Sequence, residues 1–211
     1  MRSGNSLAVA ILAATLAACA PSKPAPTAAP PAAASAPVAV SVAQFTALRE
    51  QWGARDDFTA LCENGRSQLQ ELSVQAQAGQ WDEVLAVVQP WTQQCPVDIL
   101  AHQITATALT KLGREPEAQE HVRMYRGLVD SILASGDGRT PQTAFVVISV
   151  AEEYAILRVF QLKPARQAVL DGGVDAITVE NGGGTATIYF NPAAHRRRMG
   201  RTVGEPAAAP R

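Results

Sequence analysis

The sequence predicts an α+β protein, in which antiparallel helical hairpins are followed by a small β-α-β-β-β unit with an antiparallel sheet. Two observations predict this class. From residue 42 to residue 135, apolar residues recur three and four positions apart, which is typical of amphipathic helices. After residue 135, short runs of β-branched residues are separated by glycine-rich turns, which is typical of strands.

The composition of the 211-residue chain is that of a folded protein, with 47% hydrophobic and 18% charged residues. The formal net charge of −1 argues against a generally basic nucleic-acid binder. Beyond the N-terminal segment, the sequence contains no run of about 18 apolar residues, which excludes a protein that spans a membrane repeatedly.

Residues 1–18 predict a lipoprotein signal peptide. Arg2 is followed by a ten-residue apolar stretch at 7–16, and Leu16-Ala17-Ala18-Cys19 has the pattern of a lipobox. Cys19 would then be the first mature residue and would carry lipid chains such as palmitate, which anchor the protein to a membrane. Ala20, in place of an aspartate, favours the outer membrane, facing the periplasm. The alternatives are an ordinary signal peptide and a buried apolar helix, in which Cys19 is incidental.

Residues 19–41 predict a tether behind the lipidated cysteine. Proline and alanine dominate this segment, and no apolar periodicity is present. Such a segment is extended and semi-rigid, with polyproline character. Its reach is at most about 65 Å, at roughly 3.1 Å per residue. A structural arm packed on the folded domain is the alternative interpretation.

Two cysteines, Cys62 and Cys95, remain once Cys19 is assigned to lipid. In an exported chain this number predicts one disulfide, which would stabilise the fold by roughly 3–4 kcal/mol in the chain-entropy model. Two separate buried thiols are the alternative. No C-x-x-C spacing indicates redox activity. His102 and His121 do not stand at ligand spacing to a cysteine, so we interpret them as ordinary helix histidines and predict no metal or cofactor.

The helical region at 42–135 has features of a repeat. Gly79 and Gly113 lie 34 residues apart, and each separates two predicted helices. A period of 34 residues with helix–turn–helix units is typical of tetratricopeptide repeats. The stretch from Cys95-Pro96 to Ala118 resembles one such repeat, with Ala118 as the small packing residue of its second helix. A plain helical bundle with chance spacing is the alternative.

The region at 136–192 predicts the small α/β unit. The run TAFVVISV at 143–150 is typical of a strand. Ser149 and Glu152 have the spacing of a capping box, which would start a short helix. Three further strands are predicted at Gln167–Leu170, Val174–Glu180 and Thr185–Asn191, with a turn at 181–184 between the last two.

This part of the sequence resembles a bacterial family of uncharacterised lipoproteins that carry a domain of unknown function. The matching motifs are SGDG at 135–138, TAF at 143–145, ISVAEEY at 148–154 and YFN at 189–191. The resemblance extends over about residues 45–192. The sequence departs from the family pattern at Val174-Asp175, which lacks an aromatic residue before the aspartate, and after Asn191, where the chain is polar. The resemblance implies relatives but no reaction.

Four carboxylates are candidates for a site: Asp137, Glu152, Glu153 and Asp175. Paired carboxylates perform acid/base catalysis or bind a divalent cation. Each of the four also has a structural interpretation, as a turn residue, a helix cap, a solvated acid or the first residue of a strand. No phosphate loop, catalytic serine or cysteine motif, or zinc-protease motif is present in the sequence, so we do not expect an enzyme.

The last segment, 193–211, is basic. It contains the run His195-Arg196-Arg197-Arg198 and ends in alanine and proline. We predict a disordered, solvated tail here. Contact with anionic lipid or polysaccharide of the envelope is the alternative.

Two functional hypotheses follow from the sequence. The first is a membrane-anchored module of the cell envelope that binds or scaffolds another envelope protein or polymer. The second is an envelope domain that binds or hydrolyses a ligand through the carboxylate cluster. The two hypotheses differ in whether these four carboxylates converge in one cleft.

Overall fold

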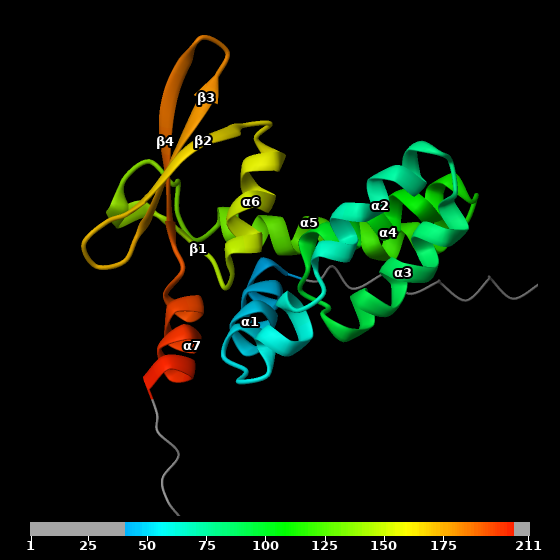
Figure 1. Cartoon of the computed structure of the whole chain (residues 1–211), viewed down its shortest axis with the longest axis horizontal. Coiled ribbons are helices and arrows are strands. Elements are labelled where there is room, and N and C mark those ends of the chain that lie inside the picture. The colour runs from blue at the N-terminus through cyan, green and yellow to red at the C-terminus, as the bar shows by residue number, and fades with distance from the viewer. Residues whose placement is uncertain (1–40, 205–211) are drawn as a thin grey trace, which may run out of the picture. The chain divides into compact units, whose positions relative to one another are not determined.

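The computed structural model describes residues 41–204, which form an α+β fold as predicted (Figure 1). The predicted signal peptide, Cys19 and almost all of the predicted tether lie outside the described residues, as do residues 205–211. The helices are α1 (Val42–Gly53), α2 (Ser67–Gln77), α3 (Trp81–Gln94), α4 (Ile99–Lys111), α5 (Glu115–Leu133), α6 (Val150–Val159) and α7 (Ala193–Gly204), with a π-helical turn η1 (Thr59–Glu63) and a 3-10 turn η2 (Pro141–Thr143). None of the helices in this described part is long and apolar enough to cross a membrane.

Two helical hairpins, α2–α3 and α4–α5, form most of the N-terminal half. Gly79 and Gly113 lie just beyond the ends of α2 and α4, with φ angles of +74° and +72°. This left-handed conformation reverses the chain after a helix, and glycine adopts it without steric cost. Helices α3 and α5 begin 34 residues apart, so the period found in the sequence corresponds to two successive hairpins.

The two hairpins share a small apolar cluster. Its buried members come from all four helices, and Ala118 of α5 is fully buried among them, as expected for the small packing residue. The cluster consists of Leu69, Leu72, Val84, Leu85, Val88, Ala101, Ala108, Leu109 and Ala118. Pro90 lies inside α3 without ending the helix, which runs on to Gln94.

Helix α1 packs on α5, at the opposite side of the hairpin stack from α2. Phe45 of α1 is buried against Gly127 of α5. A Cβ atom added at Gly127 would lie 2.1–2.3 Å from three ring atoms of Phe45. The absence of a side chain at residue 127 therefore allows the α1–α5 contact.

Replacing Gly127 by alanine is expected to destabilise the fold by about 1–3 kcal/mol, because the buried Phe45 ring has to move away from the new methyl group. Gly200→Ala in α7 is the matched control, since a Cβ there meets no atom within 4 Å. Alanine's helix propensity makes that change neutral or slightly stabilising. Urea unfolding of both variants tests this difference, and equal midpoints would contradict the contact.

The sheet contains four strands, β1 (Phe145–Val146), β2 (Lys163–Val169), β3 (Asp175–Asn181) and β4 (Gly184–Asn191), in the order β1-β4-β3-β2. Three of them are antiparallel neighbours as predicted, whereas β1 runs parallel to β4, with Phe145 opposite Phe190. The sheet is therefore mixed. A parallel pair needs a long crossover, which here is formed by α6, β2 and β3.

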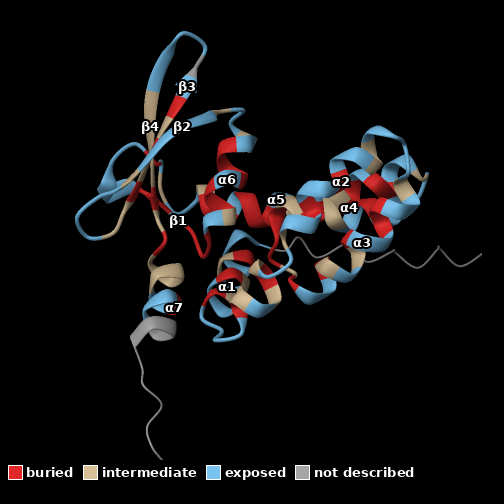
Figure 2. Cartoon of the chain, in the orientation of Figure 1, coloured by how far each residue is buried: buried red, intermediate tan, exposed pale blue. Residues whose placement is uncertain are grey.

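Strand β1 is much shorter than the β-branched run at 143–150 suggested. After Val146 the chain leaves the sheet, since Val147 and Ile148 are buried in the core and Ser149 is already the N-cap of α6. Strand β2 is longer than predicted and begins at Lys163, because the polar KPARQ stretch forms an exposed edge strand (Figure 2).

One apolar core joins the helical region to the sheet. It contains buried residues from α1, η1, the 95–99 segment, α5, α6 and every strand except β2. Helix α6 lies between the sheet and the helical hairpins (Figure 1). The disulfide predicted between Cys62 and Cys95 is present in this core and joins η1 to the residue that follows α3.

Residues 193–204 form α7, where the sequence predicted a disordered tail. Arg198 explains the difference, because its guanidinium is buried and donates hydrogen bonds to the carbonyls of Gly53 and Ile148, both at 2.6 Å. The same group lies 4.1 Å from the centre of the Phe58 ring. The carbonyl of Gly53 is a helix-end group that needs a donor, and Arg198 supplies it. One arginine of the basic run, Arg198, therefore has a structural role as a hydrogen-bond donor to the folded core.

Candidate functional site

Polar side chains meet at the N-terminus of α6, where the helical region joins the sheet. Arg49 of α1 forms a bidentate ion pair with Glu152 of α6, with N–O distances of 2.8 and 2.6 Å. Both side chains are only 4% exposed. Arg49 also donates to Ser131 Oγ at 3.3 Å and to the carbonyl of Val146 at 2.8 Å. Arg49 therefore connects α1, α5, β1 and α6.

The capping box predicted for Ser149 and Glu152 is not formed. Ser149 is the N-cap of α6, but its hydroxyl makes no capping hydrogen bond. Glu152 Oε2 instead accepts a hydrogen bond from the backbone N–H of Ile148 at 2.8 Å. The prediction was wrong because Arg49, which is 103 residues away in sequence, draws the carboxylate into the core.

Glu153, the next residue of α6, is completely buried. Neither of its carboxyl oxygens has a hydrogen-bond donor among the described residues. Burial, followed by the neighbouring negative charges of Asp175 and Glu152, raises the pKa of Glu153 to about 9. The uncharged form of Glu153 is therefore favoured at pH 7, next to Asp175, which is itself buried at the start of β3.

Asp137, the fourth candidate, is not part of this group. It is exposed in the loop before η2, where it accepts hydrogen bonds from Thr143 Oγ1 at 2.5 Å and from the N–H of Arg139 at 3.0 Å. These two donors lower the pKa of Asp137. The structure thus brings Glu152, Glu153 and Asp175 together around α6, and it gives Asp137 the role of a turn residue.

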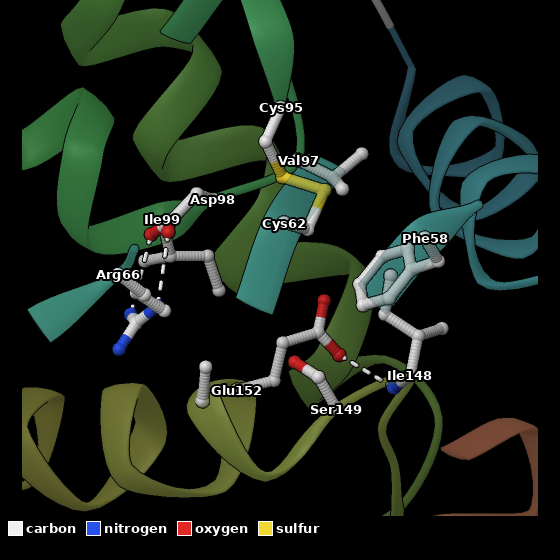
Figure 3. Close-up of a pocket in the computed structure, with 11 residues that line it drawn as sticks. Phe58, Cys62, Arg66, Cys95, Val97, Asp98, Ile99, Ile148, Ser149 and Glu152 are labelled. Atoms are coloured by element: carbon white, nitrogen blue, oxygen red, sulfur yellow. Dashed lines mark hydrogen bonds and ion pairs between the residues drawn. A yellow bond between two sulfur atoms is a disulfide. The ribbon is translucent and has the colours of Figure 1, made fainter. Parts of the chain in front are cut away.

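A small pocket lies between α6 and the disulfide (Figure 3). Its lining includes Phe58, Asp98 and both cysteines on one side, and Ser149 and Glu152 on the other. The cavity volume is about 20 Å³, which is enough for roughly one water molecule. A substrate cannot reach Glu152 through this pocket without a rearrangement of the core.

Asp98 organises the far side of the same pocket. It caps α4 by accepting from the N–H groups of Leu100 and Ala101, and it also accepts from Trp91 Nε1 at 3.0 Å and Arg66 Nε at 3.0 Å. Asp98 was not among the residues predicted to form a site. An aspartate directly before an apolar helix is an N-cap signal that could have revealed part of this role.

His102 of α4 and His121 of α5 face each other, which the sequence did not predict. Their Nδ1 atoms are 3.0 Å apart, and His102 Nε2 lies 2.9 Å from the carbonyl oxygen of Pro96. His102 is buried and His121 is half-buried. Burial lowers the pKa of both imidazoles. Among residues 41–204, no three His, Cys, Asp or Glu side chains gather closely enough to hold a metal ion together.

Comparison with known proteins gives one match. A family model described as a domain of unknown function (DUF4919) matches residues 57–199, which is more than half of the chain. No curated protein and no solved structure matches the chain. The matched segment contains η1, the disulfide, both helical hairpins, the sheet, all of α6 and most of α7, but not α1 with Arg49.

Proposed function

This chain belongs to the DUF4919 family, and we propose that it is a lipid-anchored module of the bacterial cell envelope that binds another envelope protein. The proposal combines two features of the sequence with the architecture of residues 41–204. The first feature is the lipobox that ends in Cys19, and the second is the Pro/Ala-rich segment that follows it. An anchor and a semi-rigid tether would hold the folded part at a distance from the membrane.

The observation that carries the binding role is the stack of two helical hairpins. Stacked hairpins bury one face of each helix on their neighbours and present an extended surface to partners. Here α2 and α4 expose mostly uncharged polar side chains, such as Gln70, Gln103 and Thr107, together with Val74, which is 69% exposed. Interfaces between proteins are depleted of charge at their centre, which fits this surface.

A hydrolytic role for the carboxylates has less support. Glu152 is occupied by Arg49, and Glu153 is completely buried, so neither group is placed to touch a substrate. The separation of Asp137 from the other three removes the fourth member of the cluster. We therefore assign these carboxylates to the stability of the fold and propose no reaction for them.

Site-specific photo-crosslinking in intact cells tests the binding role. A photoreactive amino acid placed at Gln70, Gln103 or Thr107 is expected to give one discrete adduct with an envelope protein. The same residue at Arg139, in the exposed loop before η2, is the control and is expected to give none. An anchored, folded and abundant protein without an adduct at any hairpin position would contradict the proposal.

The lipid anchor is tested separately. We expect cells fed an alkyne-bearing palmitate analogue to label the protein through Cys19, and we expect Cys19→Ala to abolish labelling and release the chain from the membrane fraction. Ala20→Asp is the matched variant, which should keep the label but move the protein to the inner membrane. Labelling that persists in Cys19→Ala would contradict the lipobox interpretation.

A further inference from the structure

His102 and His121 are two titratable side chains that contact each other. Neither the fold nor the proposed function explains this contact. The two residues are 19 positions apart in sequence and lie on neighbouring helices of one hairpin. Their Nδ1 atoms approach to 3.0 Å, with ring centres 5.2 Å apart. One imidazole is buried, while the other is half-buried and reaches the surface of the hairpin.

The protons of this pair follow from its surroundings. Pro96 offers a carbonyl oxygen 2.9 Å from His102 Nε2, so that nitrogen must carry the proton and donate it. In the neutral ring, His102 Nδ1 then bears a lone pair directed at His121. A backbone carbonyl that holds the remote N–H of an imidazole in this way is the usual second contact of a metal-binding histidine.

We propose that His102 and His121 together bind one divalent transition-metal ion of the kind that imidazole prefers, such as Zn²⁺ or Ni²⁺, through their Nδ1 atoms. Metal–nitrogen bonds of about 2.0–2.1 Å place two neighbouring ligands roughly 3 Å apart, which is the separation found here. An ion at this distance from both nitrogens lies to one side of the line that joins them, so each imidazole turns to direct its Nδ1 lone pair at the ion. His121 stays neutral because the proton on Nδ1 is lost to solvent and Nε2 is protonated instead.

The surroundings of His121 favour a cation. Glu117 lies one helical turn before His121 on α5, and Glu120 is adjacent in sequence. Glu117 is 53% exposed and forms an ion pair with Arg114, which it has to leave in order to rotate towards the ion. Water, or Glu117 after such a rotation, completes the coordination, since among the described residues no third His, Cys, Asp or Glu side chain lies close enough to join the two imidazoles as they stand. The lowered pKa of both histidines keeps them neutral, and therefore able to bind metal, at pH 7.

Thermal unfolding of the full chain, purified in detergent, tests the site. Zn²⁺ or Ni²⁺ at about one hundred times its dissociation constant is expected to raise the Tm by roughly 5–10 °C, whereas Mg²⁺ should have no effect. Isothermal titration should give one ion per chain. Acidification to pH 5 should weaken binding, since protons compete for the same nitrogens.

His121→Gln is the decisive variant, because its half-buried position allows the change without disturbing the core. We expect it to abolish the Tm shift, as should His102→Gln. His195→Gln, which alters the remaining histidine of the chain, is the matched control and should keep the full shift. A chain that shows no shift with either ion, or a shift that survives in His121→Gln, would overturn the proposal. The result is independent of the crosslinking outcome, so the two proposals fail separately.

Discussion

Replacing Arg49 by alanine is expected to lower the free energy of unfolding by about 3–5 kcal/mol, which is a large share of the stability of an ordinary domain. The change leaves the Glu152 carboxylate, whose side chain is only 4% exposed, with the Ile148 N–H as its remaining donor. A buried charge without a counter-charge costs far more than the net value of the ion pair itself. Urea unfolding should show a lower midpoint with an unchanged slope.

Two further variants distinguish the stability contributed by the buried ion pair from a general effect of losing an arginine. Arg55 forms a similar bidentate pair with Asp57 and lies over the Trp52 ring, but both charged side chains are about half exposed, so Arg55→Ala should cost much less stability than Arg49→Ala. The double variant Arg49→Met with Glu152→Leu should recover most of the loss, because apolar side chains remove both charges at once. If Arg49→Ala and Arg55→Ala unfolded at the same urea concentration, the buried pair would not exist in solution.

The sequence predicted the parts of the fold that depend on local patterns. Apolar spacing and the glycines at 79 and 113 gave the helical hairpins, because these signals lie within the elements that they specify. The cysteine count gave the disulfide between Cys62 and Cys95. The β3–β4 hairpin followed from alternation around a glycine-rich turn.

Contacts between distant segments were not predictable in the same way. Glu152 was expected to cap its own helix, and the structure pairs it with Arg49 across 103 residues. Arg198 looked like a solvated charge within a basic run, and it is buried on carbonyls from α1 and the α6 entry loop. In both cases the local sequence shows only that the residue is charged. Its binding partner is determined by how α1 and α7 pack on the core.

The candidate site was only partly predictable for the same reason. The acidic residues at 152, 153 and 175 do meet around α6, because the start of β3 brings Asp175 next to Glu153. Asp137 does not join them, since its loop satisfies the carboxylate locally with Thr143 and Arg139. The histidine pair was missed because residues 102 and 121 become neighbours only when α4 and α5 fold back on each other.

Replacing Glu153 by glutamine is expected to stabilise the protein above neutral pH. The pKa of Glu153 is raised from 4.5 to about 9 in the fold, first by burial and then by the charge of Asp175. Between these two values, the folded chain holds a proton that the unfolded chain has released. Each pH unit in this window therefore lowers the free energy of unfolding by up to about 1.4 kcal/mol. The stabilising contribution of the bound proton is complete below pH 4.5 and is lost as the pH rises towards 9.

Glutamine has the shape of the protonated glutamate and does not titrate. The variant therefore does not lose stability at residue 153 as the pH rises. We expect the wild-type chain and Glu153→Gln to be similar at pH 5 and to differ by roughly 3–5 kcal/mol at pH 8. The difference between the two curves reports the loss of the Glu153 carboxyl and of its interaction with Asp175, because the groups distant from this site, including His102 and His121, titrate in both chains. Glu71→Gln on the exposed face of α2 is the control and should follow the wild-type curve at every pH. Parallel curves for the wild type and Glu153→Gln would show that Glu153 reaches solvent and that its pKa is not raised in the fold.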